Sequence, residues 1–212
     1  MLSKTVFTPS ISDKIRTGPG LSIDQAAALF VFFKHCSLFR WSDANNDCED
    51  RANAICILLD EWGIANCKGW VFSGYVFRKA GYLKNMWKYH VASAVPVSEN
   101  GNVTLYIIDP ATSESLVEVA DWAANVTDNP HSYYLLKTGT VYIFPKNIAK
   151  DKWYERNKRN YNWTMQGLSG INGLSTKGKA QLRFNKKKLL RTRDLFHQLR
   201  KTKPLFLSQI PG

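Results

Sequence analysis

The order of apolar and polar residues predicts two helices in the first third of the chain. Residues 25–34 contain the longest apolar run, 26–33, and either Ser22 or Asp24 before it suits the N-cap of a helix. The run is much shorter than the roughly 20 apolar residues that cross a membrane, so it predicts a buried helix. Residues 1–20 are rich in turn formers and are expected to be a loose lead-in.

The second helix is predicted over residues 48–62. Asp47 suits its N-cap, and Gly63 suits the position just after its end. Cys48 shares the apolar face of this helix, so its thiol is expected at the start of the buried stripe. The other members of that face are Ala52, Ile55, Cys56, Leu59 and Trp62. The polar residues 39–47 before the helix predict a loop.

Aromatic and β-branched residues then predict strands. The strands are expected at 70–78, 89–97, 103–109 and 140–144. Asn-Gly at positions 100–101 predicts a two-residue hairpin turn, because this pair readily adopts positive φ angles. Residues 119–126 form a short amphipathic segment, whereas residues 157–176 are polar and dotted with glycine.

The hairpin register brings two polar side chains together. If pairing begins with Glu99 and Asn102, the antiparallel register places His90 opposite Ala111. Asp109 is then a diagonal neighbour of His90 on the same face, within reach of its side chain. The hairpin is therefore expected to hold an imidazole against a carboxylate.

Cys48, His90 and Asp109 carry the groups that a cysteine hydrolase needs. The amides and the positive dipole end of a helix N-terminus are expected to lower the pKa of the Cys48 thiol. His90 would accept the thiol proton and deliver one to a leaving amine, while Asp109 sets the tautomer of the ring. The alternative for each is structural: an unreactive helix-start cysteine, a strand histidine, and a carboxylate that caps the turn at Pro110.

The remaining histidines and Cys56 have no such arrangement. His35, His131 and His197 lack a comparable partner pattern and are expected to be structural or solvated. Cys56 lies in the middle of the second helix on its apolar face and is expected in the core.

Composition indicates one folded domain with an appendage. The chain has 212 residues, of which 44% are hydrophobic. Its four cysteines are too few for a disulfide scaffold, although one disulfide bridge is possible. The sequence has no C-x-x-C pair of the kind that suggests a zinc site. The expected organisation is a lead-in at 1–20, a catalytic domain at 21–176 and a basic extension at 177–212.

The positive charge is concentrated in that extension. The net charge is +12, and residues 177–203 hold 11 Lys and Arg against a single acidic residue, Asp194. Leucine and phenylalanine between these charges predict an amphipathic helix. Three roles compete for it: a docking face for an acidic partner or an anionic membrane, a nucleic-acid contact, and a solvated helix that closes the core.

Four short pieces of the chain resemble the bacterial protein-glutamine glutaminases, which are protein deamidases with a papain- and transglutaminase-like core. They are Cys36-Ser-Leu-Phe-Arg-Trp41, Cys48-Glu-Asp-Arg-Ala52, Trp87-Lys-Tyr-His-Val-Ala92 and Ile107-Ile-Asp-Pro110. The second and third pieces are fairly specific, whereas Ile-Asp-Pro alone is common. Weaker similarity continues through Trp122 and residues 141–142 to about Gly173.

The resemblance implies an α+β fold in which the catalytic cysteine begins a helix packed on an antiparallel sheet. It implies that Cys48, His90 and Asp109 hydrolyse the side-chain amide of glutamine within a protein or peptide, without a cofactor or metal. A Cys36–Cys67 disulfide is compatible with the family. The basic extension has no recognisable counterpart there, and the inhibitory pro-region of secreted members is missing.

Further residues are expected to bind substrate and the oxyanion. Trp41, Trp87 and Tyr89 would line the groove for the aliphatic part of glutamine, with ordinary core packing as the alternative. The Cys48 amide would be one oxyanion donor, and the loop after Trp41 a second, with Ser42, Asn45 and Asn46 as its candidates.

Other activities and more than one location are compatible with the sequence. A transglutaminase or a cysteine peptidase on the same scaffold is the nearest alternative, and a non-catalytic basic binding module is the more distant one. The first residues lack the apolar stretch of a secretory signal. A secreted enzyme or an effector delivered to another cell is favoured.

Overall fold

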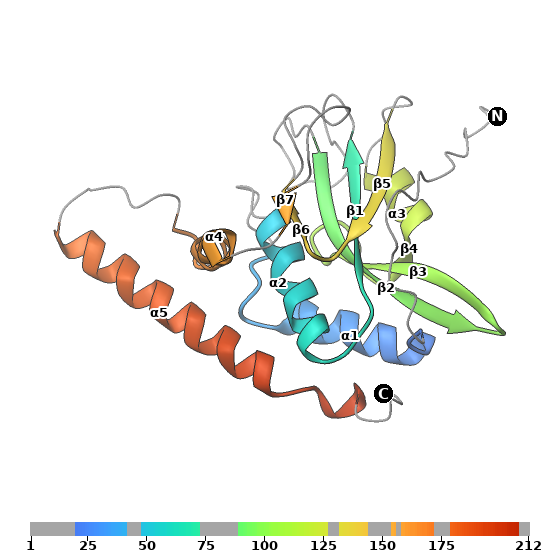
Figure 1. The fold of residues 1–212 in the computed structure, drawn as a ribbon, viewed down its shortest axis with the longest axis horizontal. Coiled ribbons are helices and arrows are strands. Elements are labelled where there is room, and N and C mark those ends of the chain that lie inside the picture. The colour runs from blue at the N-terminus through green and yellow to red at the C-terminus, as the bar shows by residue number, and fades with distance from the viewer. Residues whose placement is uncertain are drawn as a thin grey trace.

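The computed structural model describes residues 20–41, 48–72, 89–126, 132–143, 154–155, 158–171 and 179–207. Helices cover both faces of an antiparallel sheet, with α1 and α2 on one face and α3 on the other (Figure 1). The predicted α+β class is therefore confirmed. The lead-in at 1–19 and the expected N-cap residue Asp47 lie outside the described residues. No helix within the described ranges has the length and apolar character needed to cross a membrane.

The two predicted N-terminal helices are present. Helix α1 (Ile23–His35) is capped by Ser22, whose hydroxyl accepts from the Gln25 backbone while the Gln25 side chain accepts from the Ser22 backbone. Helix α2 (Cys48–Glu61) begins at the predicted cysteine. It ends before Gly63, whose φ of +72° turns the chain away from the helix.

The main sheet has five strands in the order β4-β3-β2-β1-β5. Their bounds are β1 (Cys67–Phe72), β2 (Tyr89–Glu99), β3 (Asn102–Ile108), β4 (Val117–Glu118) and β5 (Tyr133–Thr138). A smaller two-stranded sheet joins β6 (Val141–Ile143) to β7 (Tyr154–Glu155). Strands β4, β5 and β7 were not predicted, because two of them are only two residues long and β5 pairs with β1, far away in sequence.

The predicted hairpin is confirmed in its register. Glu99 pairs with Asn102, and pairing continues to Ser93 opposite Ile108. The turn residues have the expected positive φ angles, 51° at Asn100 and 81° at Gly101. Because β2 is one of the inner strands, this register decides which of its side chains face each helical layer.

Side chains of β2 alternate between two parts of the core. Val95 and Val97 pack with α1 and α2, whereas Ala92 and Ala94 pack with helix α3 (Val119–Val126) and its buried Trp122. The predicted amphipathic segment at 119–126 is thus a helix that covers the second face of the sheet. Cys56 is fully buried, as expected.

The C-terminal region adds helix α4 (Lys158–Leu168), helix α5 (Lys179–Lys201) and a short 3-10 turn, η1 (Leu205–Leu207). Helix α4 was missed because its sequence is polar, and it buries Thr164 and Met165 against the rest of the protein. Helix α5 confirms the predicted amphipathic helix. It packs beside α2 and α4 (Figure 1).

The inner face of α5 closes the core. Phe196 is fully buried, and Leu195 and Leu199 pack against the cluster formed by α1 and α2. The Trp62 indole donates to the Leu199 backbone oxygen at 3.1 Å. The structural role considered for the basic extension therefore holds for this face of the helix.

The Cys36–Cys67 disulfide, which the sequence left as a possibility, is not formed. All four cysteines are thiols. Cys36 follows α1 and packs against the α1–α2 cluster, whereas Cys67 is buried in the cluster on the α3 side of the sheet. The two sulfurs therefore belong to different layers of the fold.

Candidate active site

Cys48 is the first residue of α2 and lies against the beginning of β2. It is 7% exposed and packs with Ala52, Trp70 and Val91. Burial raises the pKa of its thiol, and the charge of Glu49 adds to this. The Arg51 charge and a hydrogen bond from the Val91 backbone lower that pKa without reversing the shift.

The expected lowering of the Cys48 pKa is therefore wrong for the resting protein. A helix N-terminus favours the thiolate, but removal of the sulfur from water disfavours it more strongly at this position. The sulfur is a neutral thiol at rest and needs a base to become a nucleophile.

His90 and Asp109 lie together, as the hairpin register predicted. His90 Nε2 and Asp109 Oδ2 are 2.7 Å apart, and both side chains are buried. The last pair of the β2–β3 ladder is Ser93 with Ile108, so the contact forms just beyond the paired strands. Because Asp109 engages Nε2, Nδ1 is the ring atom through which His90 can exchange a proton.

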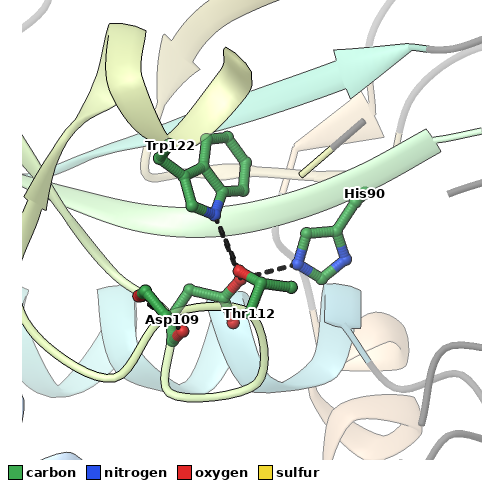
Figure 2. Close-up of polar contacts among 5 residues, drawn as sticks. His90, Asp109, Thr112 and Trp122 are labelled. Atoms are coloured by element: carbon green, nitrogen blue, oxygen red, sulfur yellow. Dashed lines mark hydrogen bonds and ion pairs between the residues drawn. The ribbon is translucent and has the colours of Figure 1, made fainter. Parts of the chain in front are cut away.

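Two side chains that the sequence did not indicate also contact Asp109. Trp122 Nε1 lies 3.2 Å from Asp109 Oδ2 and 2.9 Å from Thr112 Oγ1. The Thr112 hydroxyl donates to the same carboxylate oxygen. Figure 2 shows Trp122 and His90 approaching from different sides, with Thr112 between them.

These contacts keep the buried carboxyl ionised. Burial alone would raise the pKa of Asp109, but the charge of His90, hydrogen bonds from His90 and Thr112, and the charge of Arg51 together lower it below its ordinary value. Asp109 therefore stays an anion beside the imidazole.

The three groups converge at one end of the sheet. Cys48 begins α2, His90 is near the start of β2 and Asp109 follows β3. The Cys48 sulfur interacts with the backbone of Val91, the residue next to His90, and senses the charge of Asp109. A thiol, an imidazole and an ionised carboxylate therefore come from segments that meet at this end of the sheet.

The expected substrate residues are placed only in part. Trp41 is half-buried, stacks on Phe39 and donates its indole N–H to the Phe33 backbone oxygen at 2.9 Å. Tyr89 is half-buried beside Cys48, next to Trp70. Ser42, Asn45, Asn46 and Trp87 lie outside the described residues.

Comparisons with known proteins point to one family and one fold. The sequence model of the family described as Glutaminase matches residues 26–126, a segment that contains Cys48, His90 and Asp109. Over this segment, which is just under half of its length, the chain is similar to the glutaminase family. The resemblance found in the sequence is thereby confirmed, and the proteins that the chain resembles are enzymes.

Solved protein-glutaminase structures share the fold of this chain. The structure of protein-glutaminase from Chryseobacterium proteolyticum matches with a TM-score of 0.53 and 20% identity, covering 74% of this chain and 92% of that one. A crystal structure of protein-glutaminase matches with a TM-score of 0.56 and 18% identity, covering 79% and 90%. A mutant of pro-protein-glutaminase also matches, with a TM-score of 0.56 and 20% identity, over 79% of this chain and 64% of that one. The comparison with curated proteins gives no match.

Arg51 is a charged component of the candidate site, and the sequence had not suggested a role for it. Its guanidinium is buried, lies over the Trp41 ring at 5.5 Å and contacts the Arg40 backbone oxygen at 3.4 Å. It lowers the pKa of both Cys48 and Asp109. The sequence spacing could have indicated this role, because residues three apart in a helix, such as Cys48 and Arg51, lie on one face.

Two carboxylates in the first turn of α2 are each held by a tyrosine. The Tyr89 hydroxyl donates to Glu49, and the Tyr142 hydroxyl donates to Asp50 at 2.8 Å. Burial, followed by the neighbouring carboxylate, raises the pKa of both tyrosines, so both remain protonated. These pairs tie the turn that carries Cys48 to strands β2 and β6. Across the described part of the chain, no group of three or more His, Cys, Asp and Glu is placed to hold a metal ion.

Proposed function

We propose that this glutaminase-family enzyme hydrolyses the side-chain amide of glutamine residues in proteins or peptides, which yields glutamate and ammonia. The observation that carries the proposal is the 2.7 Å contact of His90 with Asp109 at the end of the sheet where Cys48 begins α2. A base oriented by an ionised carboxylate beside a thiol is the arrangement that nucleophilic amide hydrolysis needs.

In the proposed first step, His90 Nδ1 takes the proton of the Cys48 thiol and the sulfur attacks the side-chain carbonyl carbon of glutamine. The raised pKa of the thiol makes this transfer necessary, because little thiolate exists at rest. Asp109 remains ionised and stabilises the resulting imidazolium without taking its proton. The Cys48 backbone amide, at the start of α2, is a donor suited to the tetrahedral oxyanion.

The second half of the proposed cycle releases both products. The imidazolium of His90 protonates the amide nitrogen, the carbon–nitrogen bond breaks and ammonia leaves a thioester on Cys48. His90 then takes a proton from water, whose oxygen attacks the thioester carbon. The sulfur departs, recovers the proton from His90, and the glutamate carboxyl group is released.

A single comparison of products tests the reaction. A glutamine-containing protein is incubated with the enzyme, with and without a primary amine, and analysed by mass spectrometry and an ammonia assay. Free ammonia together with glutamate at former glutamine positions supports the proposal. Amide-linked amine indicates a transglutaminase, cleavage of the backbone indicates a peptidase, and no change in any assay indicates a non-catalytic protein.

We also propose that the outer face of α5 binds an anionic lipid surface. Its exposed cations are Arg183, Lys186, Lys187, Arg191 and Lys201. Two large apolar side chains lie among them and are unusually exposed, Phe184 at 61% and Leu190 at 48%. Cations near anionic headgroups contribute about 1 kcal/mol each, and exposed apolar side chains can enter the interface between them.

Two multiple variants test this surface. Glutamine at positions 183, 186, 187 and 191 removes charge, whereas alanine at 184 and 190 removes only apolar area. Both variants are expected to reduce cosedimentation with anionic vesicles. Neither is expected to change cosedimentation with neutral vesicles, which serve as the control. If the charge variant loses retention on RNA or DNA while vesicles never bind, the face is a nucleic-acid contact and the lipid proposal is wrong.

A further inference from the structure

The hydrogen bonds around Asp109 have a direction that follows from the chemistry of their donors. An indole N–H can donate but has no acceptor atom, so the 2.9 Å contact between Trp122 Nε1 and Thr112 requires the Thr112 oxygen to accept. The single hydroxyl proton of Thr112 is then directed at its other partner, Asp109 Oδ2. The same oxygen lies 3.2 Å from the indole nitrogen.

This directional chain determines what His90 can do. Asp109 Oδ2 receives hydrogen bonds from Thr112 and Trp122, so it is held as an acceptor and is stabilised as an anion. The atom facing it at 2.7 Å, His90 Nε2, must therefore donate. In a neutral imidazole only one nitrogen carries a proton, so Nδ1 is left as the acceptor, which is the state that a base requires.

We propose that Thr112 and Trp122 are positioning residues that set the proton direction of the His90–Asp109 pair. They keep Asp109 ionised and thereby hold His90 in the Nε2–H tautomer, with Nδ1 available to take the thiol proton. The inference rests on the proposed function for its kinetic consequences. Its effect on the tautomer is a property of the protein without substrate.

The local fold makes this role specific to Thr112. Its backbone N–H donates to the Asp109 backbone oxygen at 3.1 Å, so the turn that follows β3 returns the hydroxyl to the carboxylate three residues earlier. Trp122 comes from α3, on the far side of that turn, and its ring is buried 5.8 Å from the His90 ring. Removing the hydroxyl of Thr112 therefore interrupts the chain while leaving the packing of Trp122 in place.

The test compares Thr112→Val, which has a similar shape and no hydroxyl, with Thr112→Ser, which retains the hydroxyl. In wild type, the nitrogen-15 spectrum of His90 should report the Nε2–H tautomer. Thr112→Val should shift the His90 tautomer population toward Nδ1–H and lower kcat roughly tenfold with little change in KM. It should also move the fall of activity on the acidic side of the pH profile to higher pH. Thr112→Ser should restore all three. Thr140→Val is a matched control, because it removes a hydroxyl that pairs with Thr138, an exposed contact.

Each result has a defined consequence. A wild-type tautomer and an unchanged acid limb in Thr112→Val would overturn the proposal, whatever its effect on stability. Failure of Thr112→Ser to restore the tautomer would do the same, because it retains the proposed donor. If wild-type protein releases no ammonia, the proposed function fails. The tautomer measurement, which uses no substrate, still decides the positioning role.

Discussion

At the scale of single residues, catalysis depends on where protons reside before substrate arrives. Burial keeps Cys48 protonated, whereas the charge that His90 carries when it is protonated, the hydrogen bonds from His90 and Thr112, and the charge of Arg51 keep Asp109 ionised. The two shifts have opposite directions because the thiol receives little compensation for lost hydration, while the carboxylate is surrounded by donors. In the proposed mechanism the thiolate therefore forms only when His90 removes the thiol proton.

Cys48→Ala should lower the rate of ammonia release by about a thousandfold or more, because the variant lacks the thiol that forms the proposed thioester. The side chain is small, so the free energy of unfolding should change by about 1 kcal/mol or less. Ammonia production and urea unfolding measure the two effects. Cys36→Ala is the control, since Cys36 follows α1 and lies outside the cluster that contains Cys48. Equal activity in the two variants would remove Cys48 from its role.

Asp109→Asn should change the pH dependence of stability as well as the rate. A carboxyl whose pKa is lowered by folding stabilises the protein above its unfolded pKa of about 3.9, and this contribution is lost as pH falls toward the folded pKa. From about pH 5 to about pH 3, urea unfolding should show a larger loss of stability in wild type than in Asp109→Asn. Parallel loss in both proteins would mean that Asp109 is not held ionised by the fold.

At the scale of elements, the β2–β3 hairpin positions His90 and Asp109, the pair proposed to be catalytic, and the first turn of α2 positions the Cys48 thiol. The hairpin could be predicted because an Asn-Gly turn specifies a register, and the register extends as far as His90 and Asp109. Strand β5 and helix α4 could not, because their pairing and burial depend on partners far away in sequence. Polar residues of α4 contact polar residues of other elements in the interior. For example, the Asn53 side-chain amide of α2 donates to the Thr164 hydroxyl of α4 at 2.7 Å.

The turn of this hairpin gives a test of the element. Gly101 has a φ of +81°, and no atom lies within 4 Å of the position of an added Cβ, so a side chain there would cost backbone strain without a steric clash. Gly101→Ala should lower the free energy of unfolding by about 1–2 kcal/mol. Gly101→Asn should cost less, because asparagine tolerates this conformation. Equal losses, measured by urea unfolding, would contradict the assigned turn.

At the scale of the whole molecule, α5 has two faces with different roles. Its inner face completes the core through Phe196, and its outer face presents five exposed cations, Arg183, Lys186, Lys187, Arg191 and Lys201. The helix is stabilised by this packing and not by its own charges, since its first turn contains no acidic residue to complement the helix dipole. The basic extension is therefore part of the folded structure, and its charged surface is held in a defined orientation.

Two phenylalanines of the same helix separate these roles. Phe196→Ala should lower the free energy of unfolding by about 3–5 kcal/mol, because the ring is fully buried. Phe184→Ala should change it by about 0.5 kcal/mol or less, because that ring is 61% exposed. Thermal or urea unfolding of both variants provides the measurement. Similar values for the two would show that α5 does not close the core.

Local pattern alone was sufficient for α1, α2, α5 and the hairpin, and for the contact of His90 with Asp109. Helical periodicity, caps and a two-residue turn act over a few positions, so their outcome can be inferred from neighbouring residues. Packing decided the rest. The protonation of Cys48, the approach of Trp122 to Thr112 and the separation of Cys36 from Cys67 depend on which distant segments exclude water or supply donors, and those contacts exist only in the folded chain.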